Sequence, residues 1–314
     1  MGQQDQKNHQ SGLPIEVDLA QDLAWLLQSQ PLMANQQATP FKLTLSNCPE
    51  HHCTTYPAQP AYRLGKHFED CVDLFFAGSN QHQVLGRNIV ITATRQTAQK
   101  KVQQTVQQTI GELDLLYRNA AQQIIHLEIA IKFYLLEKQG TTLSNFIGPA
   151  GHDRLDLKWE RLLNHQLPMS QRPETTQFLN QHQLPLPEAR ELLLTGMLFY
   201  AYENWQHTQV SNIGLNPEHQ RGWWLEHHEL DQLSGLSKDD QLTGYVILPK
   251  WHWIGGHRHY SNPQPISYGA MKASVSADVW PNMVVIYTRQ SLSHTWQPVS
   301  RGLILATKKP PLVS

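Results

Sequence analysis

The stretch GELDLLYRNAAQQIIHLEIAIKFYL, residues 111–135, decides the fold of this chain. Both of its halves are largely apolar, and the second, IIHLEIAIKFYL, is rich in β-branched and aromatic residues, which are typical of strands. The polar segment NAAQQ between them predicts a turn, because neither half continues through it. We therefore expect two neighbouring strands of one sheet.

Charged side chains interrupt both of these strands. Alternation places Glu112 and Asp114 on one face of the first strand, and Glu128 and Lys132 on one face of the second. A carboxylate buried in a sheet costs free energy unless it is paired or binds a cation. Adjacent strands can bring Asp114 and Glu128 together, and carboxylate oxygens suit Mg²⁺ or Mn²⁺. Such a cation activates water and orients a phosphate, and a nearby lysine stabilises the developing charge.

A structural alternative fits the same residues. Glu128 and Lys132 then form an ion pair on a solvated face of the strand, and GELD is an ordinary turn. The apolar context of the second strand and the order of the surrounding elements favour the metal site.

The flanking sequence predicts an α/β fold with a mixed sheet between helices. Periodicity and turn residues predict, in chain order, a helix over 63–78, strands over 84–92, 109–119 and 124–136, a helix over 153–167 and a strand within 189–205. A polar connection, RQTAQKKVQQT (95–105), is expected between the first two strands. Asp153 is the expected N-cap of the second helix.

Four regions are expected along the chain. They are a disordered N-terminus (1–15), an N-terminal helical segment (16–62) with a helix from Val17 to Met33, a core (63–204), and a Trp- and His-rich, β-leaning C-terminal region (205–314).

Composition limits the classes of function. The 314 residues carry a net charge of -1 and only 16% charged residues, so any nucleic-acid surface must be local. Three cysteines indicate a reducing compartment, and neither a secretory signal nor a membrane-spanning segment is recognisable. We therefore expect a cytoplasmic protein without a membrane partner.

The order helix, three strands, helix, strand resembles the core of the PD-(D/E)XK nucleases. Glu69 in LGKHFED, Asp114 in GELDL and Glu128 in HLEIAIK stand at the positions of that superfamily's acidic residues. The resemblance covers about residues 63–203 and implies that Asp114 and Glu128 bind Mg²⁺ (or Mn²⁺), with Glu69 assisting and Glu112 supporting the ligands. It also implies hydrolysis of phosphodiester bonds, with DNA as the expected substrate.

A closer resemblance covers nearly the whole chain. The segments GELDL, HLEIAIKFYL, GP-x-x-x-D-RLDLK and GWW resemble the bacterial domain-of-unknown-function family 1853, which is placed by remote similarity in the same nuclease superfamily.

The chain departs from the nuclease pattern at one position. The motif lysine follows the glutamate by two residues, and here that position is Ala130. Lys132 shares the face of Glu128 but lies about 13 Å further along an ideal strand, and it is the expected catalytic lysine. Lys158 on the following helix is the alternative. If neither lysine reaches the site, the protein is an inactive nuclease-like module that binds nucleic acid or a partner protein; a small-molecule metalloenzyme is a third class.

Further candidates remain around this site. Arg154, Lys158 and Arg161 are spaced to form either a phosphate-facing stripe or a solvated helix face. The cluster CPEHHC (48–53) has compressed spacing for zinc, and a chance loop cluster is the favoured interpretation. The Trp223–Trp224 pair either packs in the core or stacks on unpaired bases.

Overall fold

The structure is a computed structural model of the chain. It describes residues 14–34, 38–44, 49–57, 63–99, 102–138, 140–210, 213–236, 242–275, 281–291 and 294–306, and between 94 and 106 only the backbone. Of the region expected to be disordered, residues 1–13 lie outside the described part.

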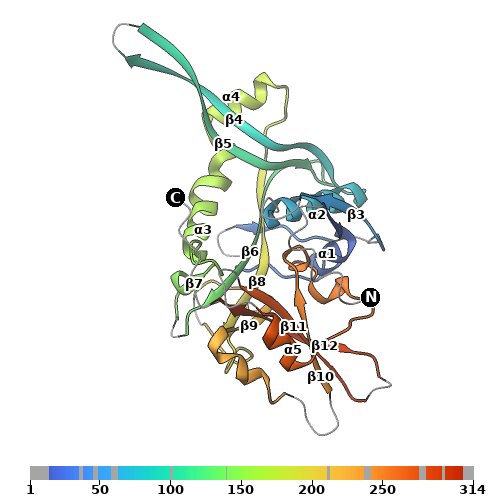
Figure 1. Cartoon of the computed structure of the whole chain (residues 1–314). Helices are drawn as coiled ribbons and strands as arrows, with labels where there is room; N and C mark the ends of the chain where they lie inside the picture. Colours follow the sequence, from blue (N-terminus) through green and yellow to red (C-terminus); the bar gives the residue numbers. More distant parts are fainter. Residues whose placement is uncertain are drawn as a thin grey trace.

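A large mixed sheet forms the centre of the molecule (Figure 1), which confirms the α/β class. Its main strands, in spatial order, are β10 (Leu242–Leu248), β11 (Asn282–Arg289), β12 (Gln297–Leu305), β9 (Arg221–Glu226), β8 (Ala189–Ala201), β6 (Ile124–Leu136), β5 (Val102–Arg118) and β4 (Gln83–Gln99). The short strands β2 (Thr39–Pro40) and β7 (Phe146–Ile147) pair with β8 and β6. The pairs β6–β8, β8–β9 and β9–β12 are parallel, whereas β4–β5–β6 form an antiparallel meander.

The helices are short apart from the one that precedes this meander. They are α1 (Leu19–Leu26), α2 (Leu64–Gly78), α3 (Leu155–Arg161), α4 (Pro173–Gln181) and α5 (Tyr268–Ser274). Thus α2, the three meander strands, α3 and β8 follow one another in the predicted order, with β7 and α4 inserted. In the part of the chain that the structure describes, no helix has the length and hydropathy needed to cross a membrane.

The prediction of a polar connection over residues 95–105 is wrong. Strands β4 and β5 continue through it and pair up to Gln99 and Val102. The antiparallel backbone ladder carries these strands past the last apolar residue, so side-chain patterning does not mark where they end. The resulting hairpin projects beyond the rest of the molecule (Figure 1).

The N-terminal helix is shorter than predicted. A strand, β1 (Ile15–Asp18), comes first and pairs with β3 (Cys53–Tyr56). Asp18 then caps α1, because its carboxylate accepts a hydrogen bond from the backbone of Ala20 at 3.1 Å. The helix ends at Leu26 instead of continuing to Met33.

Helices cover both faces of β6 (Figure 1). Leu127 and Ile131 point to the face that packs with α1 and α2. Ala130 and Tyr134, on the other face, pack with the buried Leu155 of α3. Strand alternation therefore directs the even-numbered side chains of β6, Glu128 and Lys132 among them, toward α3.

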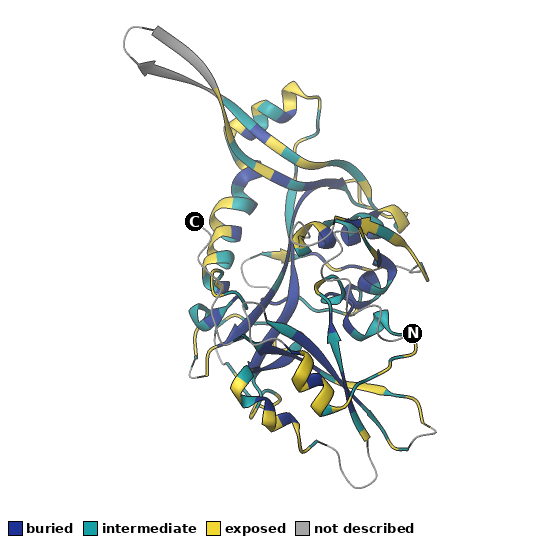
Figure 2. Cartoon of the chain, viewed as in Figure 1, coloured by how far each residue is buried: buried dark blue, intermediate teal, exposed yellow. Residues whose placement is uncertain are grey.

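The residues after 205 extend the same sheet. Strand β9 pairs in parallel with β8, and β12 pairs in parallel with β9. Most of β9 and the second half of β12 are buried (Figure 2), and α5 covers them with its buried Met271. The sheet therefore runs without interruption from the core into the C-terminal region.

Candidate active site

Two carboxylates lie where β5 and β6 separate. Backbone pairing between these strands ends at Leu115 and Leu127, and Asp114 and Glu128 are the next residues in that register. From there β5 stays with β4, and β6 stays with β8. One oxygen of Asp114, Oδ2, accepts a hydrogen bond from the amide of Ile129 at 3.0 Å, in place of a strand partner. The site is thus a fork in the sheet.

Both carboxyl groups are shielded from water, Asp114 partly and Glu128 completely. Glu128 is fully buried, and its two oxygens lie 2.8 Å from His126 Nε2 and 2.6 Å from Gln166 Nε2. Burial raises the pKa of Asp114 and of Glu128 to about 7 each, and the charge of Glu128 adds to the rise at Asp114. The pair is close enough to share a hydrogen bond, so near neutral pH it retains a proton.

Lys158 supplies the positive charge of this site. It lies on α3 and donates a hydrogen bond to Gln166 Oε1 at 2.9 Å, while Gln166 donates to Glu128. Its charge opposes the rise in the pKa of Asp114 and Glu128. Burial, together with the neighbouring Lys132, lowers the pKa of Lys158 itself. His126 adds no charge at neutral pH, because burial lowers its pKa to about 4.

Gln166 belongs to a π-helical turn (η3, Leu162–Gln166) that follows α3 directly. Such turns interrupt the normal helical spacing and often occur at functional sites. The wider turn directs Gln166 back toward β6, between Lys158 and Glu128. Sequence reasoning missed Gln166 and His126, because neither residue type nor spacing signals a contact that depends on how a helix lies across a sheet.

Lys132 points to a different partner. Its ammonium group forms an ion pair with Asp153, in the loop before α3. The predicted N-cap is therefore wrong: Arg154 occupies that position without a side-chain cap, and Asp153 is engaged with Lys132.

Glu69 and Glu112 extend the row of acidic groups away from the fork. Glu112 is largely exposed. Partial burial of its carboxyl group raises its pKa, and the charges of Asp114 and Glu69 raise it further. On α2, Glu69 Oε2 lies 3.7 Å from Lys66 Nζ. Glu112 therefore lies within electrostatic range of both Glu69 and Asp114.

The three basic residues of the expected stripe differ in environment. Arg154 is exposed and bonds Asp156 through two nitrogens, at 3.0 and 2.6 Å. Arg161 is exposed, whereas Lys158 turns inward to Gln166. Only the two arginines therefore present their side chains to solvent.

The remaining candidates lie away from the fork. Trp223 and Trp224 are buried, as core packing requires. In the CPEHHC segment, Cys48 lies outside the described residues, Cys53 is exposed, and His51 Nδ1 lies 2.8 Å from an Asp18 oxygen.

Comparisons with known proteins place the chain in a family. No curated protein and no solved structure matches it. The profile of the family described as "Domain of unknown function (DUF1853)" matches residues 21–305, which is most of the chain. The chain therefore belongs to the DUF1853 family.

Proposed function

We propose that this protein is a divalent-metal-dependent nuclease with a PD-(D/E)XK-type core that hydrolyses phosphodiester bonds in DNA. The observation that carries the proposal is the Asp114–Glu128 pair, a half-buried and a fully buried carboxyl group held together where β5 and β6 separate. A protein that only needed a stable core would place apolar side chains at this position, because burial of two acids is costly.

The donor set fits Mg²⁺ or Mn²⁺. Carboxylate oxygens are the ligands that these hard cations prefer, and both groups must lose their protons to bind one. When bound, the cation lowers the pKa of a water molecule and polarises the phosphate. Glu112 and Glu69 continue the acidic row toward the surface, where they assist the metal ligands.

Lys158 takes the part of the motif lysine in this proposal. Lys132, the residue expected for that part, is paired with Asp153, whereas Lys158 interacts electrostatically with both carboxylates. The Gln166 bridge fixes the distance between Lys158 and Glu128. An ammonium group held there stabilises negative charge on a phosphate oxygen during bond cleavage.

Metal binding is the first test. Wild type is expected to unfold at a higher temperature in Mn²⁺, because a ligand that binds only the folded state stabilises it. The Asp114→Asn/Glu128→Gln double variant is expected to lose this shift. Glu160→Gln, an exposed carboxylate on α3, is the matched control and should keep it. Equal shifts in all three proteins would refute a site at the fork.

Cleavage of end-labelled single- and double-stranded DNA, with RNA in parallel, is the second test. Glu128→Gln should reduce the rate by more than about a hundredfold, beyond what loss of an outer hydrogen-bonding partner costs. Lys158→Met is expected to cost about a hundredfold or more, and Lys132→Met less than about tenfold. If Lys132→Met lowers the cleavage rate more than Lys158→Met does, Lys132 is the catalytic lysine instead.

A second function is favoured by one specific observation. Ala130 stands at the motif position, and both oxygens of Glu128 already have hydrogen-bonding partners, His126 and Gln166. An inactive nuclease-like module would have this arrangement. It predicts DNA binding that is unaffected by Mn²⁺ and by Asp114→Asn, with no cleavage.

A further inference from the structure

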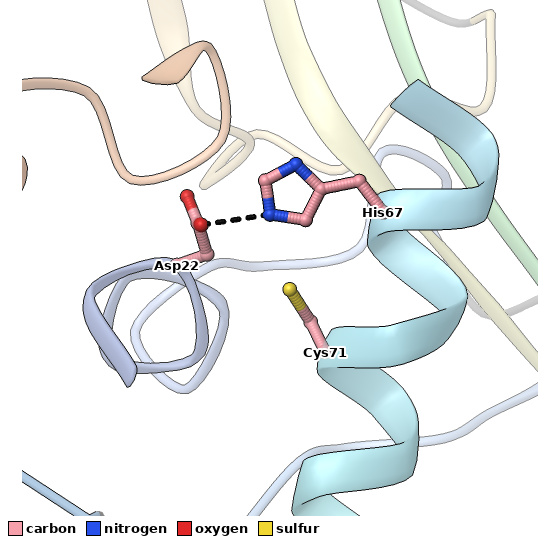
Figure 3. Close-up of side chains that lie close together, drawn as sticks. All are labelled: Asp22, His67 and Cys71. Carbon is pink, nitrogen blue, oxygen red and sulfur yellow. Dashed lines mark hydrogen bonds and ion pairs between the residues drawn. The ribbon is translucent and has the colours of Figure 1, made fainter. Parts of the chain in front are cut away.

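A second cluster of potential ligands lies between α1 and α2. Asp22 of α1 and His67 and Cys71 of α2 are each fully buried, with relative exposures of 0%. One ligand atom from each residue lies within 4.8 Å of the other two. Figure 3 shows Cys71 directed toward the pair formed by Asp22 and His67.

The local sequence explains this arrangement. His67 and Cys71 are four residues apart in LGKHFEDC, so they lie one turn apart on the same face of α2. That face packs against α1, from which Asp22 Oδ2 lies 2.9 Å from His67 Nε2. The sequence of this helix does not by itself indicate a site at His67 and Cys71, because their partner residues are remote in the chain.

A fourth group comes from the C-terminal region. His259, in a short 3₁₀ helix (η7, Gly256–His259), places Nε2 2.9 Å from Asp22 Oδ1 and is only 3% exposed. The Gly255 amide donates to the same carboxylate oxygen at 2.5 Å. A Cβ at Gly255 would lie 2.8 Å from both Asp22 Oδ1 and His259 Nε2, so the backbone approaches the cluster as closely as a glycine allows.

These donors form a set that suits zinc. One thiol, two imidazoles and one carboxylate match the sulfur, nitrogen and oxygen ligands of four-coordinate protein zinc sites. In a tetrahedral site with bonds of about 2.0–2.3 Å, ligand atoms lie roughly 3.5 Å apart. The ligand atoms of Asp22, His67 and Cys71 already lie within 4.8 Å of one another. Small side-chain rotations would therefore bring them to the distances of a zinc site.

We propose that Asp22, His67, Cys71 and His259 bind one structural Zn²⁺ ion. Binding releases the thiol proton of Cys71 and the imidazole protons now directed at Asp22. The ion joins α1, α2 and η7, which are widely separated in sequence, and it holds the C-terminal region against the core. Because these ligands are distinct from Asp114 and Glu128, this proposal does not depend on nuclease activity.

Elemental analysis of the full chain, expressed with added zinc and purified without a histidine tag, is the first measurement. Wild type should contain about one zinc ion per chain, and Cys71→Ser markedly less. Cys53→Ser, the other described cysteine but exposed, is the matched control and should retain the metal. The Asp114→Asn/Glu128→Gln variant should also retain it, which separates the two sites. Zinc-free wild type would overturn the proposal.

Cobalt provides a test that does not rely on affinity alone. Wild type loaded with Co²⁺ should show a cobalt–thiolate charge-transfer band and tetrahedral ligand-field bands. Cys71→Ser should lose the charge-transfer band, and Cys53→Ser should keep it. Circular dichroism of each variant verifies that it is folded. If Cys71→Ser is unfolded, wild type alone decides whether a cysteine binds the metal. The metal is removed with a chelator, the thiols are alkylated and Co²⁺ is added again; the charge-transfer band should then be lost. Absence of a thiolate band in wild type would exclude Cys71 as a ligand.

Discussion

At the residue scale, the Asp114–Glu128 pair makes the stability of the protein depend on pH. A carboxylate in an ion pair has a lowered pKa and loses stabilisation when acid protonates it. Here burial raises both values to about 7, from 3.8 and 4.5, so the protonated form is favoured in the folded state. Protonation of the pair therefore stabilises the folded protein fully at pH values below the ordinary pKa values of 3.8 and 4.5. This stabilisation is lost as the pH rises toward 7.

The expected result is a fall in the free energy of unfolding between about pH 4.5 and about pH 8, larger in wild type than in Asp114→Asn. Replacing Asp114 removes one of the two carboxyl groups whose pKa is raised to about 7, so only Glu128 still contributes to this pH dependence. Urea unfolding of both proteins across this range, in magnesium-free buffer, measures the difference. Parallel curves for the two proteins would show that the pair does not titrate as described.

Which lysine approaches the two carboxylates is hard to predict from sequence, because a side chain's partner depends on neighbouring elements. Alternation correctly places Lys132 and Glu128 on one face of β6. It does not reveal that Asp153 lies over Lys132, or that α3 directs Lys158 toward the fork. The orientation of α3 follows from the burial of Leu155, a tertiary contact.

At the element scale, the close pairing of β6 with β8 depends on a glycine. Gly196 has a φ of +136°, and a Cβ there would lie 1.8 Å from the carbonyl oxygen of Lys132. Since that neighbour is backbone, it cannot move aside cheaply. The strand that carries Glu128 and Lys132 is thus held in place by an approach that only glycine permits.

Gly196→Ala is expected to destabilise the protein by more than about 3 kcal/mol, through strain at an unfavourable φ and steric overlap. Gly269→Ala is the matched control: no atom lies within 4 Å of the added Cβ, in helix α5, and a small stabilisation is expected. Denaturant unfolding of both variants gives the comparison. A loss below about 1 kcal/mol for Gly196→Ala would contradict the described pairing.

The projecting β4–β5 hairpin should contribute little to overall stability, because an isolated two-stranded ribbon is marginal in water. Replacing residues 94–107 by Asn-Gly joins Ala93 to Gln108, which are partners in the ladder, through a two-residue turn. The melting temperature should change by less than about 3 °C. A large fall would mean that the outer hairpin packs against other parts of the molecule.

The sequence predicts some helices and strands of this protein better than others. Periodic apolar residues identify α2, and β-branched residues identify β6, because each pattern reflects the element's own burial. The outer halves of β4 and β5 are mostly Gln and Thr, with too few apolar residues to show an alternation. Their pairing arises from the backbone of the opposite strand.

At the scale of the whole molecule, the sheet connects the core to the C-terminal region through main-chain hydrogen bonds. Strand β9 pairs with both β8 and β12, and Trp224 Nε1 donates to the carbonyl of Leu136 in β6 at 2.8 Å. Buried Arg301 of β12 donates to the carbonyls of Trp253 and Ile254 at 3.0 and 3.1 Å. These contacts favour one cooperative unit.

A single calorimetric unfolding transition is therefore expected, with equal calorimetric and van't Hoff enthalpies. Gly302→Ala tests the coupling, because its Cβ would lie 2.0 Å from the buried Trp223 ring. The substitution in β12 should lower the melting temperature of the entire transition by several degrees, about 2–4 °C per kcal/mol. Two separated transitions, only one of them shifted, would show that the regions unfold independently.

Strand β12 follows β10 and β11 along the chain yet lies between β11 and β9 in the sheet. During synthesis, the β10–β11 hairpin therefore leaves the ribosome before the strand that attaches it to the rest of the sheet exists. Until residues 297–305 emerge, β9 and β11 each expose a backbone edge able to pair with another chain. The nascent protein is consequently prone to aggregation in the interval between the synthesis of β11 and that of β12, and chaperone protection would matter at that stage.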